Sequence, residues 1–335
     1  MVHWNLVRKR QIYAIQAVLL ILLVVGFSFL SDFEGQASDD AFEIVERYQM
    51  PIKELSGLTV FQGADGREKL VAVGDKTAKI VIYDPISKDA QTVRFKKQLI
   101  EKFSLCTDSL TQTCKKLIKK LSSDWEAIAA GDDGLFYILQ EHSQAIVVLD
   151  PFENDIKAVI NFDILAKSHG SVQKSSLKFR TNSLGEGLVK MGARFLVAKE
   201  MYPLSIVELG PKGSASRGFG DEDLKLNDSS SENIARLSYE TLAHWELAGH
   251  SKCDFSELTA MNNRLLALSQ KCRKLMVFNS LPAGGGSITP DEIYSLPREI
   301  RSPEALAVLS DGRIVIGSDV KKQKTNLYLL KWTRN

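Results

Sequence analysis

One short pattern recurs four times in this chain, at intervals of roughly fifty to seventy residues, and each copy places a glutamate before apolar residues. A short turn and then a strongly apolar run follow each glutamate. An earlier fifth copy has Ser56 at this place. The glutamates of the four copies are Glu126, Glu186, Glu257 and Glu304. This repetition predicts a radial array of β-sheet blades, because no single copy can bury its own apolar faces.

Each copy has the pattern of a strand, a tight turn, a second strand, a turn and a third strand, with a fourth strand before the next copy. The runs 135–139 and 145–149, for example, are apolar throughout and flank a polar turn. Such runs are expected where blades pack face to face. Residues 42–48 form a further strand, which we expect to complete the last blade and close the ring. The sequence therefore predicts an all-β, five-bladed β-propeller, with six blades as the alternative.

The N-terminal part has the features of a membrane anchor. Basic residues precede an apolar run at 12–30, and acidic residues follow it. At about 1.5 Å per residue this helix nearly spans a hydrocarbon core of about 30 Å. The positive flank predicts a cytoplasmic tip and transmembrane signal anchor at 1–30, a linker at 31–45, and a periplasmic propeller at 46–335 held on the inner membrane. A signal peptide cleaved after Ala37 is the alternative, although its apolar region is usually only about 7–15 residues long.

Four cysteines fit an exported protein. Cys106 and Cys114 flank a short polar loop, and Cys253 and Cys272 bracket a predicted hairpin. Two local disulfides, 106–114 and 253–272, are the simplest pairing in an oxidising compartment. A zinc site is the alternative, but no C-x-x-C motif or neighbouring histidine supports it.

The overall charge argues against a polyelectrolyte partner. The formal net charge of the 335 residues is +2, and charged residues make up 25% of the chain. No nucleic-acid-binding motif is present. The sequence instead predicts a small ligand or an envelope protein as the partner.

The segment Glu186-Gly-Leu, followed by Arg194-Phe-Leu-Val-Ala-Lys-Glu200, resembles the SdiA-regulated (YjiK-like) family of membrane-anchored β-propellers. The resemblance covers residues 45–333 and implies a propeller behind a single N-terminal anchor. It implies no settled activity. A more distant similarity to phytase-like esterase and lactonase propellers implies a carboxylate-lined channel and calcium. The chain departs from the family pattern where a glycine is missing, at Ala127, Leu258 and Ala305.

The repeated acidic residues define the candidate site. The glutamates begin the innermost strands, and the second strand of each copy returns to the same rim, where a further set of mostly acidic residues stands. Like charges at 4 Å cost about 4 kcal/mol per pair at an effective dielectric of 20, so a divalent cation, protonation, or lysine and arginine partners must offset the repulsion. Calcium suits oxygen ligands in an irregular cage. The predicted metal ligands are Glu126, Glu186, Glu257, Glu304, Glu141, Glu200, Asp319 and Asp75, with Gln270 at the corresponding place in the copy that contains Glu257.

Two other interpretations of these residues stay open. The carboxylates can act as structural latches that accept backbone N–H groups, or they can take part in catalysis with His142 as a general base. A solvated loop histidine is the alternative for His142. Trp125 either stacks on a ligand at the channel mouth or packs between blades. The expected function is a ligand- or partner-binding module, and the alternative is a metal-dependent phosphoesterase, esterase or lactonase.

Overall fold

The computed structural model describes residues 41–95, 124–141, 144–162, 185–200, 203–220, 238–320 and 325–333. Every helix or strand assigned in these ranges is a β-strand. No helix in these ranges is long and apolar enough to cross a membrane. The expected anchor at 12–30, Cys106, Cys114 and His142 lie outside the described residues.

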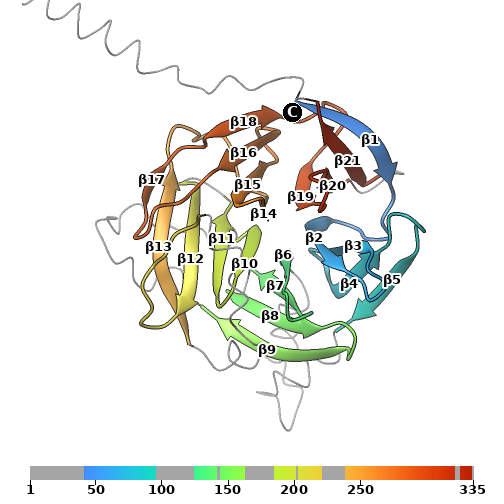
Figure 1. Cartoon of the computed structure of the whole chain (residues 1–335), viewed down its shortest axis with the longest axis horizontal. Helices are drawn as coiled ribbons and strands as arrows, with labels where there is room; N and C mark the ends of the chain where they lie inside the picture. Colours follow the sequence, from blue (N-terminus) through green and yellow to red (C-terminus); the bar gives the residue numbers. More distant parts are fainter. Residues whose placement is uncertain are drawn as a thin grey trace, which may run out of the picture. The chain divides into compact units, whose positions relative to one another are not determined.

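The strands form five blades around a common axis, and the predicted five-bladed propeller is confirmed (Figure 1). Blade 1 contains β2 (Leu55–Gln62), β3 (Glu68–Gly74), β4 (Thr77–Tyr83) and β5 (Ala90–Arg94). Blade 2 contains β6 (Trp125–Ala130), β7 (Phe136–Gln140), β8 (Ala145–Asp150) and β9 (Asp155–Asn161). Blade 3 contains β10 (Gly187–Met191), β11 (Arg194–Lys199), β12 (Ser205–Pro211) and β13 (Tyr239–Leu247). Blade 4 contains β14 (Glu257–Met261), β15 (Arg264–Ser269), β16 (Lys274–Phe278) and β18 (Glu292–Ser295).

Blade 5 closes the ring with strands from both ends of the propeller. It consists of β19 (Pro303–Val308), β20 (Ile314–Ser318), β21 (Leu327–Trp332) and β1 (Phe42–Tyr48). β1 pairs antiparallel with β21, as the sequence predicts. Beside this pair, the Asn326 side chain accepts a hydrogen bond from Met50 N and donates to the carbonyl groups of Met50 and Ile52. β1 therefore begins at Phe42, inside the last residues of the expected linker at 31–45.

The chain between β16 and β18 leaves blade 4 and adds a strand to blade 3. This strand, β17 (Gly286–Ile288), pairs in parallel with β13. The Trp245 side chain donates to the Pro282 carbonyl oxygen at 2.9 Å. A Cβ atom on Gly285 would lie 2.4 Å from the carbonyl oxygen of His244. The glycine run at 284–286 therefore belongs to a close contact between two blades.

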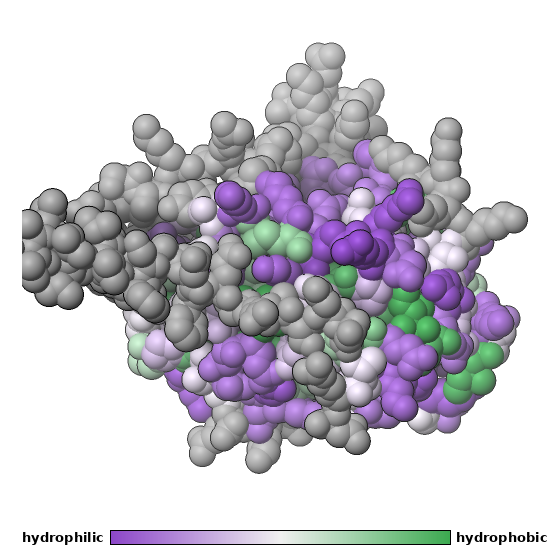
Figure 2. All heavy atoms as spheres, turned by 90° about the horizontal axis from the view of Figure 1, so that it is seen from above, coloured by the Kyte–Doolittle hydropathy of each residue, from purple (hydrophilic) through white to green (hydrophobic). Residues whose placement is uncertain are grey.

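The core lies between adjacent blades, because the middle strands are buried on both faces. All five residues of β7 are buried, and so are all five residues of β20. Trp125 is fully buried in a cluster formed by blades 1 and 2. Its role is therefore packing between blades and not ligand stacking. One side of the ring has a mostly hydrophilic surface with small, separate apolar patches (Figure 2).

The innermost strands approach each other so closely that a small residue stands at one position in four of the five blades. A Cβ atom on Gly57 would lie 2.7 Å from Ala127 Cα, and one on Gly187 would lie 2.5 Å from the backbone nitrogen of Leu258. Alanine takes the same place in blades 2 and 5. In these four blades, this position directly follows the residue of the repeated pattern, which is Ser56, Glu126, Glu186 or Glu304.

Candidate functional site

A cavity of about 360 Å³ opens where the innermost strands begin, and its walls are almost entirely acidic. Nine of its eleven lining residues carry a carboxyl group. The lining consists of Glu54, Ser56, Asp75, Lys76, Asp124, Glu126, Glu141, Glu186, Glu200, Glu304 and Asp319. Seven of the eight predicted metal ligands are among them, and Glu257 is not.

Three of the mouth residues are presented by β-bulges. The pairing of the first two strands skips one residue in blades 1, 2 and 5, and the skipped residues are Ser56, Glu126 and Glu304. A bulge adds an unpaired residue and turns its side chain away from the regular alternation. The bulges therefore direct these three side chains into the cavity.

The ends of the second strands supply the other ring, as expected from antiparallel pairing. Asp75, Glu141, Glu200 and Asp319 all line the cavity. In blade 4 the corresponding Gln270 donates a hydrogen bond to Glu304. Blade 4 therefore contributes an amide that orients a neighbouring carboxylate.

The set predicted from sequence omits two acidic lining residues, Glu54 and Asp124. Each stands two residues before the mouth position of its blade. Carboxylate oxygens of Asp75, Asp124 and Glu126 lie within 4.8 Å of one another. An acidic residue two places before the repeated one is the sequence signal that identifies this third set.

Glu257 is the predicted ligand that the structure does not bring to the cavity. It pairs with Leu268, just as Gly187 pairs with Ala198, so Ser256 and not Glu257 is the counterpart of Glu186. A shift of one residue along a strand turns the side chain to the other face. The fully buried Glu257 carboxylate accepts the backbone N–H groups of Leu258 at 3.0 Å and of Leu58 at 3.3 Å. Glu257 is thus a latch between blades, which was the alternative interpretation of the glutamates.

Burial and mutual repulsion set the protonation of the cavity carboxyls. Burial, followed by the charges of Asp75 and Glu141, raises the pKa of Glu126 to about 9. Burial raises the pKa of Glu304 to about 8, with the Asp319 charge adding to it. The pKa of Glu186 is also raised well above its usual value, first by burial. The metal-free cavity therefore favours bound protons or another cation.

The stability of the metal-free protein is expected to fall as pH rises from about 5 to about 9. Unfolded glutamates lose their protons near pH 4.3, whereas folded Glu126 and Glu304 keep theirs up to about pH 9 and 8. The folded state thus binds more protons in this window, so the free energy of unfolding decreases with pH. Urea unfolding in chelator at pH 5, 7 and 9 measures this slope. The double variant Glu126→Gln, Glu304→Gln is the control and should show a flatter dependence; an equal slope in both proteins would contradict the assignment.

Lys76 is the one basic residue among those that line the cavity, and it lies at its edge. Its Nζ atom lies 2.6 Å from Glu54 Oε1 and 3.7 Å from Asp75 Oδ2. The side chain is 61% exposed, so it neutralises only part of the surrounding charge. Lys199, which neighbours Glu200 in sequence, instead donates to the Pro203 carbonyl oxygen.

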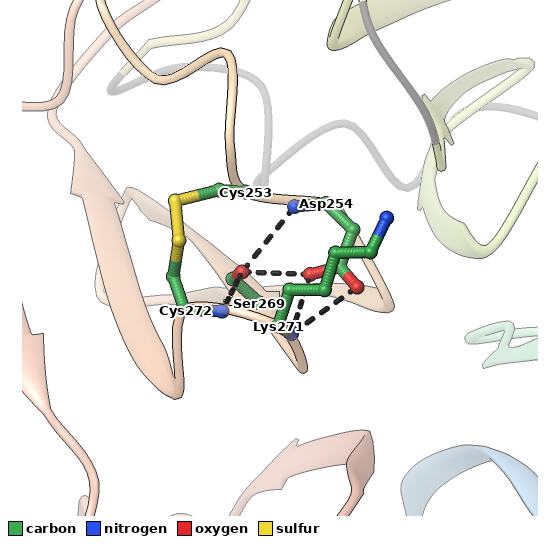
Figure 3. Close-up of a disulfide and its surroundings, with 5 residues drawn as sticks. All are labelled: Cys253, Asp254, Ser269, Lys271 and Cys272. Atoms are coloured by element: carbon green, nitrogen blue, oxygen red, sulfur yellow. Dashed lines mark hydrogen bonds between the residues drawn. A yellow bond between two sulfur atoms is a disulfide. The ribbon is translucent and has the colours of Figure 1, made fainter.

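A disulfide fixes blade 4 beside this rim and confirms the predicted pairing of Cys253 with Cys272 (Figure 3). Asp254 accepts hydrogen bonds from Ser269 Oγ at 2.7 Å and from the Lys271 backbone nitrogen at 2.9 Å. Asp254 occupies the place in blade 4 that Asp124 occupies in blade 2. Its oxygens are held by this turn, which explains why blade 4 adds no carboxylate to the cavity.

Removing the disulfide is expected to destabilise the protein without removing the cavity. The bond closes a loop with a sequence separation of 19 residues, so the loss is about 3 kcal/mol of unfolding free energy. The double variant Cys253→Ser, Cys272→Ser tests this in urea unfolding. Addition of reductant to the double variant Cys106→Ser, Cys114→Ser is the matched control and should give a similar loss.

No protein-family model matches the sequence, and no curated protein matches it. Solved structures with a similar arrangement include the glutaminyl cyclase of Myxococcus xanthus, with 10% identity, a TM-score of 0.48, and coverage of 88% of this chain and 98% of that chain. The PQQ-bound aldose sugar dehydrogenase of Streptomyces coelicolor has 10% identity, a TM-score of 0.45, and coverage of 87% and 98%. A streptogramin B lyase has 12% identity, a TM-score of 0.41, and coverage of 88% and 98%.

Proposed function

We propose that this chain is a membrane-anchored, periplasmic binding module of the SdiA-regulated type that holds calcium in the mouth of its channel. One observation carries the proposal. Nine carboxyl groups and a single lysine line a cavity of about 360 Å³. Such a concentration of like charge needs a counter-ion, and hard oxygen ligands favour calcium or magnesium.

The arrangement of the carboxylates favours calcium over magnesium. Asp75, Asp124 and Glu126 form the tightest group and come from two adjacent blades. Glu186 and Glu304 stand on other blades around the same cavity. Calcium accepts six to eight oxygens in irregular geometry, whereas magnesium demands a small octahedron and keeps much of its water. A cage assembled from four separate blades fits the first requirement better.

Calcium binding is tested on the full chain in detergent by calorimetry and thermal unfolding. We expect heat of binding and a rise in melting temperature at micromolar to millimolar calcium, because a ligand that binds only the folded state stabilises it. Magnesium at equal concentration is the control and should give a smaller shift. No heat and no shift at millimolar calcium would reject the proposal.

Replacing Lys76 is expected to strengthen calcium binding several-fold. Its ammonium group lies near Glu54 and Asp75 and competes with an added cation for the same carboxylates. The variant Lys76→Gln removes the charge and keeps a polar side chain. Lys88→Gln, at an exposed position that does not line the cavity, is the matched control. An unchanged or weaker affinity in Lys76→Gln would show that calcium binds away from this edge.

A metal-dependent hydrolase of a phosphoester, ester or lactone is the second candidate. The observation in its favour is a surplus of carboxyls, since Glu186 and Glu304 stand outside the tightest group of three. A group with a pKa of about 8, as for Glu304, can exchange protons near neutral pH. Calcium-dependent turnover of p-nitrophenyl phosphate, p-nitrophenyl acetate or a simple lactone, lost in Glu304→Gln, would favour this candidate over a binding module.

A further inference from the structure

The chain enters the propeller at the rim opposite the acidic mouth. The innermost strand of each blade starts at the mouth, and antiparallel pairing makes the third strand run away from it. In blade 5 the third strand is β21, so β21 ends, and β1 begins, at the far rim. Phe42 pairs there with Trp332, and the Thr333 backbone nitrogen donates to the Ala41 carbonyl oxygen at 3.0 Å. The residues that precede β1 are therefore attached to this far rim.

Two turns on the same rim are built alike and expose an apolar side chain each. They join the third and fourth strands of blades 1 and 2 and read Asp84-Pro85-Ile86-Ser87-Lys88 and Asp150-Pro151-Phe152-Glu153-Asn154. In each, the aspartate accepts the backbone N–H groups two and three residues later, and the fifth residue has a positive φ. Ile86 is 73% exposed and Phe152 is 68% exposed, the highest values among large apolar residues in the described ranges.

Further interfacial side chains lie where the chain enters. A cavity of about 400 Å³ at this rim is lined by Trp332 and Met261, by Arg313 and Lys331, and by Asn262, Gly312 and Asp311. Asp311 accepts a hydrogen bond from Arg313 Nε at 2.7 Å, so Lys331 is the basic lining residue outside this pair. Tryptophan and basic residues are the side chains that favour the boundary between lipid and water. This part of the rim therefore combines apolar and basic groups beside the point of attachment.

We propose that the far rim lies on the lipid bilayer, with Ile86 and Phe152 in its interface, and that the acidic mouth faces away from the membrane. The inference rests on the membrane attachment proposed above. In the sequence, β1 follows the expected anchor at 12–30 after only eleven residues. Nine carboxyls at the opposite rim would be repelled by anionic lipid, which favours the same orientation. The ligand of the mouth is then a soluble cation or an envelope partner, and not a lipid headgroup.

Fluorescence quenching in vesicles tests the orientation. The full chain is placed in vesicles of phosphatidylcholine and phosphatidylglycerol with brominated acyl chains, and a bimane label is attached at Phe152→Cys or at Lys53→Cys. Lys53 is exposed and stands just before β2, on the mouth rim. We expect the label at position 152 to be quenched at least twofold more than the label at position 53. Equal quenching, stronger quenching at 53, or no quenching at either position in vesicle-bound protein would overturn the proposal.

A second set of variants separates the rim contact from the anchor. A label at Lys88→Cys should lose quenching in Ile86→Ser, Phe152→Ser and keep it in the conservative Ile86→Leu, because only the first change removes apolar contact with lipid. Unchanged quenching in the serine variant would overturn the role of these two turns. A chain that fails to sediment with vesicles would overturn the membrane attachment itself, a result that calcium binding by the mouth does not depend on.

Discussion

Glu257→Ala is expected to lower the free energy of unfolding by about 3–5 kcal/mol and to leave calcium affinity within about twofold. The fully buried carboxyl group, whose pKa is raised well above its usual value by burial, accepts the backbone N–H groups of Leu258 and Leu58, which belong to blades 4 and 1. Its removal leaves these donors unsatisfied at about 1–3 kcal/mol each, and it also opens a small cavity. Because Glu257 does not line the mouth, the calcium site should survive.

The comparison with Glu257→Gln makes this test specific. Glutamine keeps the shape and one accepting oxygen, but its NH₂ group meets backbone donors, so an intermediate loss of stability is expected. Urea unfolding gives the stability, and calorimetry at a temperature where both variants are folded gives the calcium affinity. A variant that lost calcium binding at unchanged stability would make Glu257 a ligand and not a latch.

The ring and most of the mouth could be predicted from sequence because both follow from strand alternation. Apolar runs such as 135–139 are buried on both faces, which only blade-to-blade packing achieves, and the paired hairpins then return each second strand to the rim where the first began. This geometry alone places Asp75, Glu141, Glu200 and Asp319 beside Glu126, Glu186 and Glu304.

The remainder depends on register, which a single sequence does not reveal. In each blade an apolar residue stands two places after the position that faces the mouth. In blade 4 this residue is Leu258, so Ser256 takes the mouth position and Glu257 falls one place deeper. The bulges at Ser56, Glu126 and Glu304 depend on pairing between strands and leave no local composition signal. The return of residues 286–288 to blade 3 and the capture of Asp254 beside the disulfide are likewise long-range contacts.

The double variant Glu126→Gln, Glu186→Gln is expected to abolish the calcium response and to stabilise the metal-free protein. Both carboxyls are largely buried. Burial and the charges of neighbouring acids raise both pKa values, and the charge of Glu126 is among those that raise the pKa of Glu186. Glutamine keeps the size of each side chain and cannot ionise, so the repulsion of the empty cavity falls. The same change removes one member of the Asp75, Asp124 and Glu126 group, and calcium affinity should fall at least 100-fold.

The sign of the stability change decides between a cation site and a set of latches. Thermal unfolding at pH 8 with chelator should give a higher melting temperature for the variant than for the unmodified protein. Addition of millimolar calcium should raise the melting temperature of the unmodified protein only. Glu240→Gln is the matched control, since Glu240 lies on β13 and does not line the cavity. A variant that melts several degrees lower in chelator would show that these carboxylates hold blades together as Glu257 does, and the mouth would then be a structural seam with no ligand of its own.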